Sequence, residues 1–268
     1  MIIDKHVHTP YCPHGSTDSF ELYIEQALSL HYSEISFTEH APLPKNFVDP
    51  APDKDSAMDI SNLASYLQEL TNLKSYYRNA LKINIGLEID YIEGFEHETK
   101  EFLNEYGPYL DDSILSVHFL KNKDSYFCMD FSEEEFDRMI GHFGSLEQIY
   151  NTYFATLYKS INSDLGPFKP KRLGHITLVE KFKHRFPHAI GIDHYVIPLL
   201  DEIAKKGYEL DYNGAGFVKP LCKDSYPPSH IALEAFKRKI PLHYGSDAHS
   251  AKGLAQGYNR LEKATLND

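Results

Sequence analysis

The sequence has no tryptophan and only three cysteines, Cys12, Cys128 and Cys222. The cysteines are widely spaced and form no Cys-x-x-Cys pair, which argues against a disulfide framework and favours a reducing compartment. No apolar run approaches the roughly 20 residues that a membrane-spanning helix needs. The first residues, MIIDKH, are not followed by the apolar stretch of a signal peptide. These absences predict a soluble, cytoplasmic protein.

Positive charge is also scarce. The chain has 27 lysines and arginines against 39 aspartates and glutamates, which gives a formal net charge of −12. This excess of acid argues against broad attraction to nucleic acid or to an anionic membrane. It does not identify a substrate, because aspartates at a metal site add to the same number. A length of 268 residues with 42% apolar residues fits one large α/β domain better than two small ones.

Short apolar segments of strand type alternate with segments of helical periodicity along the whole chain. Strands are expected at residues 2–8, 34–40, 84–90, 113–119, 172–176, 208–213 and 240–247. Helices are expected at 19–30, 59–80, 95–106, 132–162 with a break near 141–144, 194–206, 228–239 and 252–264. This order predicts parallel strands joined by right-handed crossovers. Seven strand–helix units without a glycine-rich phosphate loop favour a TIM-like (β/α)7 barrel over an open sheet.

Many of the 15 histidines lie where the expected strands end. His6 and His8 alternate along the first strand, so both imidazoles lie on one side of it and can share a cation. A single histidine at a strand end is more often structural than ligating, but an ionised carboxylate such as Glu88 within an apolar strand needs a compensating cation. Because the carboxyl ends of barrel strands open on one face, we expect nine potential metal ligands to meet there: His6, His8, His14, His40, Glu88, His118, His175, Asp247 and His249.

The segments HVH, TEH, GLEID, SVH, GHIT and GSDAH resemble, in this order, the motifs of the PHP (polymerase and histidinol phosphatase) superfamily. TPYCPHG, TEHAPLP and LGHITLVEKF resemble its histidinol-phosphatase branch. The resemblance implies one PHP domain, residues 1–268, that forms a distorted seven-stranded barrel with up to three metal ions. It implies that the first metal position is held by His6, His8, Glu88 and Asp247. The second would be held by His14, His40 and His249. The third would be held by His118 and His175, with Glu88 bridging it to the first.

The same resemblance implies hydrolysis of L-histidinol phosphate to L-histidinol and phosphate in histidine biosynthesis. Histidine-rich ligands suit zinc, iron or manganese, and two or three such ions would provide a bridging hydroxide that attacks phosphorus. Glu88, Asp247 and His249 are the candidate catalytic residues. No DxDxT, RHG or CxxxxxR phosphatase signature is present, so the metal ions would have to supply the nucleophile. The expected partner is a small phosphate monoester, and the oligomeric state stays open.

Residues outside the ligand set are expected to bind the substrate. Arg172 is the first candidate for the phosphate, because a guanidinium pairs bidentately with phosphate oxygens; the alternative is a surface arginine in the segment FKPKR. Asn213 either hydrogen-bonds the substrate or caps the NGAG turn. Cys12 is expected to be a neutral loop thiol, and Lys181 to face solvent. The proline-rich residues 41–52 predict a long loop whose use as a lid stays open.

Two other functions remain possible on the sequence. A nucleotide phosphoesterase or exonuclease of the same superfamily would need a basic groove for a polyanionic strand, which the acidic composition disfavours. A metal-binding protein without catalysis would show closed coordination, with no open position for water or substrate.

Overall fold

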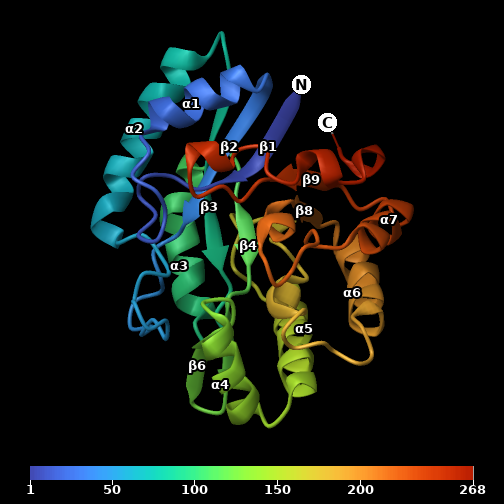
Figure 1. Cartoon of the computed structure of the whole chain (residues 1–268). Coiled ribbons are helices and arrows are strands. Elements are labelled where there is room, and N and C mark those ends of the chain that lie inside the picture. Colours follow the sequence, from blue (N-terminus) through green and yellow to red (C-terminus); the bar gives the residue numbers. More distant parts are fainter. Residues whose placement is uncertain (268) are drawn as a thin grey trace.

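A sheet of seven parallel strands forms the centre of the computed structural model, which describes residues 1–267 (Figure 1). In spatial order its strands are β1 (Ile2–Val7), β2 (Tyr32–His40), β3 (Lys82–Asp90), β4 (Ile114–Ser116), β7 (Arg172–Leu173), β8 (Glu209–Asn213) and β9 (Leu242–Gly245). Each neighbouring pair is parallel. The spatial order equals the chain order, as in a barrel and unlike a doubly wound sheet.

The two edge strands, β1 and β9, meet at their carboxyl ends. The amide of Asp247 donates to the carbonyl of His6 at 2.7 Å, and the amide of His8 donates to the carbonyl of Ala248 at 3.0 Å. Val7 forms a parallel bridge with Ala248. These contacts nearly close the sheet, so the predicted distorted seven-stranded barrel is confirmed.

Helices connect the strands and cover the outside of the sheet (Figure 1). They are α1 (Phe20–Ser29), α2 (Leu63–Tyr77), α3 (Glu96–Tyr106), α4 (Glu133–Phe143), α5 (Leu146–Asn162), α6 (Asp193–Lys206) and α7 (Ser229–Lys237). The predicted break in the helix at 132–162 occurs at Gly144, which ends α4 with a φ of 88°. Ser145 then caps α5 by accepting from the amide of Gln148. Within residues 1–267, no helix is long and apolar enough to cross a membrane.

Two expected elements differ from the structure. The region expected as one strand at 113–119 contains β4 and the start of an antiparallel hairpin, β5 (Phe119–Asn122) with β6 (Ser125–Cys128). The expected helix at 252–264 is wrong, because only short 3-10 turns form there. Hydrogen bonds to the barrel take the place of helical ones: the amide of Ala255 donates to the Tyr32 hydroxyl at 2.7 Å, and Gln256 Nε2 donates to the carbonyl of Ser246 at 2.6 Å.

The strands are buried on both faces, which is typical of parallel sheets covered by helices. In β3, every residue from Ile83 to Asp90 is buried. This continuous burial includes the polar residues near the carboxyl end, where Glu88 is 1% exposed. The fold therefore places ionisable side chains inside the protein at one end of the barrel.

Candidate metal centre

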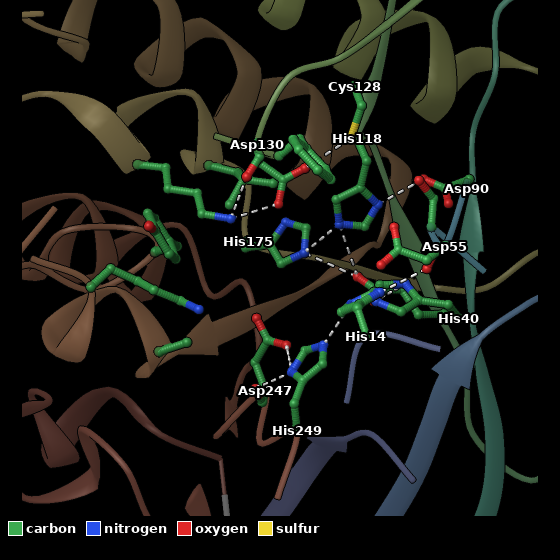
Figure 2. Close-up of a pocket in the computed structure, with 18 of the residues that line it drawn as sticks. His14, His40, Asp55, Asp90, His118, Cys128, Asp130, His175, Asp247 and His249 are labelled. Atoms are coloured by element: carbon green, nitrogen blue, oxygen red, sulfur yellow. Dashed lines mark hydrogen bonds and ion pairs between the residues drawn. The ribbon is translucent and has the colours of Figure 1, made fainter. Parts of the chain in front are cut away.

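The carboxyl ends of the strands surround a cavity of about 430 Å³. Seven of the nine predicted metal ligands line it: His14, His40, Glu88, His118, His175, Asp247 and His249. Figure 2 labels six of them, all except Glu88, and shows their side chains gathered around the cavity. The other two, His6 and His8, lie fully buried behind this wall. Their ring centroids are 5.8 Å from that of His175 and 4.0 Å from that of His249, respectively. The structure thus brings all nine side chains to one end of the barrel.

Glu88 lies in the middle of the group. Its Oε2 atom is 3.3 Å from His6 Nε2 and 3.2 Å from His40 Nδ1. Its Oε1 atom is 3.0 Å from His175 Nε2 and 3.7 Å from His118 Nε2. One carboxylate therefore faces two sets of imidazoles with its two oxygens, an arrangement that suits a ligand shared between two cations.

Asp247 adds a second carboxylate from the end of β9. Its Oδ1 atom lies 3.2 Å from His8 Nε2 and 3.8 Å from His6 Nε2. The residue has a φ of 53°, in the left-handed region that aspartate tolerates at some cost in free energy. The hydrogen bond from the Asp247 amide to the carbonyl of His6 compensates for this strain and holds the carboxylate toward the histidines.

Two pairs of imidazoles approach each other closely across the cavity. The Nε2 atoms of His14 and His249 are 3.1 Å apart, and those of His118 and His175 are 3.2 Å apart. A tetrahedral zinc ion with zinc–nitrogen distances of about 2.0–2.1 Å holds two nitrogens roughly 3.3 Å apart. Both pairs therefore have a spacing that fits a shared cation.

Several polar atoms in the group have no hydrogen-bond partner among residues 1–267, although they are buried: His6 Nε2, His8 Nε2, His40 Nδ1 and Glu88 Oε2. Burying a polar atom without a partner costs free energy, because the atom has lost its contacts with water. Sets of three or four ligand atoms here lie within 4.8 Å of one another. Imidazoles with a few carboxylates are ligands that transition metals prefer, so the residues present fit a metal centre.

The carboxylates make this end of the barrel favourable for positive charge. Burial lowers the pKa of His8, but the nearby carboxylates of Asp247 and Glu39 outweigh burial and raise this pKa to about 9. Burial raises the pKa of Glu88, and the charge of His6 is the main effect that brings this pKa well below its ordinary value. Burial and the charge of His8 instead hold the pKa of His40 and of His249 well below its ordinary value. The ionised carboxylates thus favour positive charge here, whether it comes from a proton on His8 or from a metal ion.

Cys12 is buried beside the group. Its sulfur lies within 4.8 Å of ligand atoms of His8, His40 and His249. Burial and then the charge of Glu39 raise the pKa of the Cys12 thiol. Because the thiolate is the form that binds metal, a protonated thiol agrees with the neutral side chain expected from the sequence.

Arg172 does not reach this end of the barrel, which corrects the expectation that it binds phosphate. It stands at the beginning of β7, whereas His175 follows the end of that strand. Its guanidinium is 2% exposed, donates to both carboxylate oxygens of Asp112 at 2.8 and 3.0 Å, and donates to the carbonyl of Lys5 at 2.8 Å. Arg172 therefore forms a buried structural ion pair outside the cavity.

Asn213 lies at the end of β8 as expected, but its amide is already used by the protein. Its Nδ2 atom donates to Asp211 at 3.0 Å and to Asp247 at 3.2 Å, and its Oδ1 atom accepts from the amide of Ala215 at 2.8 Å. The expectation that Asn213 hydrogen-bonds the substrate is therefore corrected, because its amide group is bound by the protein itself. Asn213 holds Asp247 and closes the turn after β8, which is the alternative that the sequence left open.

The cavity wall also contains charged residues outside the predicted site: Asp55, Asp90, Asp130, Lys181 and Lys219. Lys181 does not face solvent as expected; its ammonium forms an ion pair with Asp130 at 2.9 Å. Asp130 follows β6 and so depends on a hairpin that the sequence pattern does not separate from the preceding strand. Isolated charged residues in loops carry no pattern from which their place on this wall can be predicted.

Comparisons with known proteins agree with this geometry. Residues 4–215 match the model of the PHP domain. A histidinol-phosphatase from Bacillus subtilis is 48% identical over 95% of this chain and 96% of that protein. The crystal structure of HisK from Listeria monocytogenes has a TM-score of 0.92 at 38% identity, covering 96% of this chain and 98% of that one. The crystal structure of histidinol phosphate phosphatase from Lactococcus lactis, with zinc, L-histidinol and phosphate, has the same fold, with a TM-score of 0.71 at 22% identity over 99% of this chain and 94% of that one. On these matches, the chain belongs to the PHP domain family.

Proposed function

We propose that this protein is a metal-dependent phosphomonoesterase that hydrolyses L-histidinol phosphate to L-histidinol and phosphate. The observation that carries the proposal is the convergence of imidazoles and two carboxylates, Glu88 and Asp247, on one open cavity. Its volume of about 430 Å³ suits a small-molecule substrate. The 48% identical relative is named a histidinol-phosphatase, which supports the same reaction here.

The proposal includes two or three ions of zinc, iron or manganese. The first position would be held by His6, His8, Glu88 and Asp247, the second by His14, His40 and His249, and the third by His118, His175 and the shared Glu88. Divalent ions at these positions would neutralise phosphate charge and lower the pKa of a water molecule. The zinc in the Lactococcus lactis structure supports this class of metal. A cytoplasmic location and a single domain over residues 1–268 are part of the same proposal.

The candidate catalytic residues differ in their access to the cavity. Glu88 is 1% exposed, so its proposed contribution is to hold charge between the imidazoles. Asp247 is 17% exposed and reaches both the histidines and the cavity, which places its carboxylate to accept a proton from water or return it to the leaving oxygen. His249 is 29% exposed beside it and can contact the same phosphate group.

The remaining wall residues match the two ends of the proposed substrate. Lys219 is exposed and has no ion-pair partner among residues 1–267, so it replaces Arg172 as the proposed cation for phosphate. Burial raises the pKa of Asp130, but the charge of Lys181 outweighs burial and holds this pKa below its usual range. The ionised Asp130 is the proposed partner of the substrate ammonium.

Phosphate release from a small set of substrates tests the function. The set contains L-histidinol phosphate, p-nitrophenyl phosphate and a single-stranded oligonucleotide, with elemental analysis of the same purified protein. We expect kcat/KM to be at least about 100-fold higher for L-histidinol phosphate, because only this substrate offers an ammonium and an imidazole to the wall. Faster cleavage of the oligonucleotide, or bound metal without any phosphate release, contradicts the proposal.

A further inference from the structure

The proposed metal ligands differ in what their outer ring nitrogens contact. For three histidines, Nδ1 faces a carboxylate that was not among the predicted ligands. The distances are 2.8 Å from His6 to Asp211, 3.1 Å from His8 to Glu39 and 2.7 Å from His118 to Asp90. A carboxylate in its ionised form only accepts hydrogen bonds, so Nδ1 carries the hydrogen and Nε2 keeps its lone pair for the centre.

The carboxylates behind His6 and His8 are fixed in place. Glu39 is fully buried and also accepts from the amide and hydroxyl of Thr9, at 2.8 and 2.5 Å. Asp211 is fully buried and packs against Gly245, where a Cβ atom would come within 2.1 Å of the Asp211 carboxylate and 2.6 Å of His6 Cβ. Only glycine leaves room for this carboxylate behind the imidazole of His6.

Among residues 1–267, no carboxylate is hydrogen-bonded behind the second metal position; the nearest, Asp247 Oδ1, is 3.7 Å from His249 Nδ1. His14 Nδ1 lies 2.8 Å from the carbonyl of Asp55, and His249 Nδ1 lies 3.0 Å from the carbonyl of Asp247. These acceptors are neutral, and both imidazoles are more exposed than those of His6 and His8. His40, the third member, turns its Nδ1 toward Glu88 at 3.2 Å rather than toward an outer acceptor.

We propose that these outer acceptors grade the metal positions in affinity, so that the first position holds its ion most tightly and the second releases its ion first. An anionic acceptor at Nδ1 makes the opposite nitrogen more basic and fixes the ring, which strengthens the bond to a metal. A carbonyl fixes the ring but adds no charge. Asp211 and Glu39 are therefore positioning residues for the first ion. This inference rests on the metal centre of the proposed function.

Stepwise removal of zinc tests the order. The zinc-loaded wild-type protein is titrated with a chromogenic chelator, and the ions remaining per chain are counted by elemental analysis. We expect one ion to leave well before the others. In Asp211→Asn and Glu39→Gln, the affinity for the most tightly held ion, at the first position, should fall about 10- to 100-fold. Release of the ion at the second position, which leaves first, should stay unchanged. Asp55→Asn is the matched control, because it removes a carboxylate from the cavity wall and keeps the carbonyl that faces His14.

A second measurement needs no variant. In the 15N-histidine spectrum of the zinc-loaded wild-type protein, His6 and His8 should show a hydrogen on Nδ1 and the metal shift on Nε2. The opposite tautomer overturns the inference, as does release of all ions together or an unchanged tight ion in both variants. If the wild-type protein binds no zinc, iron or manganese, the metal centre itself is wrong, which distinguishes failure of the proposed function from failure of the graded affinities.

Discussion

Glu88 links the imidazoles of the centre, because its two oxygens face different histidines. Its Oε1 atom also accepts from the Ser116 hydroxyl at 2.6 Å. A neutral amide of the same size would keep this hydrogen bond but would lose the negative charge that faces the imidazoles. Glu88 thus accepts a structural hydrogen bond from Ser116 and also supplies negative charge to the surrounding histidines.

Glu88→Gln should therefore lose at least one bound metal ion per chain and reduce kcat at least about 100-fold. This effect should exceed that of removing a carboxylate behind a histidine, such as Asp211 or Glu39. Metal content and phosphate release are measured on the same sample. Glu93→Gln is the control, since Glu93 forms its ion pair with Lys159 at 2.7 Å, outside the cavity. A Glu88→Gln protein with full metal content and wild-type turnover contradicts the assignment.

At the scale of elements, the loop between β2 and α2 is anchored to the β5–β6 hairpin. Phe47 packs edge to face on Phe95, Phe119 and Tyr126, with ring centroids 5.1–5.2 Å apart. Further along the same loop, Asp55 lines the cavity. The loop therefore forms part of the cavity wall, and an aromatic cluster helps to hold it there, in addition to hydrogen bonds such as that of the Ala41 amide to the carbonyl of Glu88 at 2.9 Å.

Phe47→Ala should loosen this loop. Each lost aromatic contact is worth about 0.5–1.5 kcal/mol, so local opening and tryptic cleavage after Lys45 and Lys54 should become roughly tenfold faster. Cleavage is followed by mass spectrometry under native conditions. Val48→Ala changes a neighbouring side chain that is 76% exposed and should leave the rate unchanged. Equal rates in both variants would show that the aromatic cluster does not hold the loop.

At the scale of the whole molecule, the cavity at the carboxyl ends of the strands is separate from the buried ion pair of Arg172 with Asp112, neither of which lines it. Burial raises the pKa of Asp112, but the charge and hydrogen bonds of Arg172 outweigh burial and hold this pKa below its ordinary value of 3.8. A carboxyl with a lowered pKa in the folded state stabilises the fold above its ordinary pKa. This contribution is lost as the pH falls below 3.8 through the lowered value.

Asp112→Asn should lower the free energy of unfolding at pH 7 by about 3 kcal/mol, because it leaves the buried Arg172 without its counter-charge. The difference from wild type should shrink as the pH falls below 3.8, because the Asp112 carboxyl of the unfolded wild-type chain binds a proton there while the folded one is still ionised. Urea unfolding at several pH values measures this difference. Asp111→Asn serves as a control, since Asp111 pairs with Lys74 at a more exposed site. A difference that stays constant down to pH 3 would contradict a charge-based effect.

Local patterns explain how much of the site was predictable. Alternation places His6 and His8 on one side of β1, and the other ligands follow strands whose apolar character is visible in the sequence. Parallel topology then brings all strand ends to one face. The hairpin β5–β6 was not predicted, because β4 is only three residues long and the chain passes through His118 directly into β5. Asp130 was missed with it.

The sequence by itself determined the barrel and the set of residues at its carboxyl end, because strand periodicity and chain order are local properties. Only the tertiary structure decided how each polar side chain is used. Arg172 is bound by Asp112, and Asn213 by two aspartates, so neither remains for substrate. Likewise, Asp211 lies 205 residues from His6 in the chain. Such pairings depend on contacts between distant segments, and no local pattern of residues encodes which buried partner a charge will find.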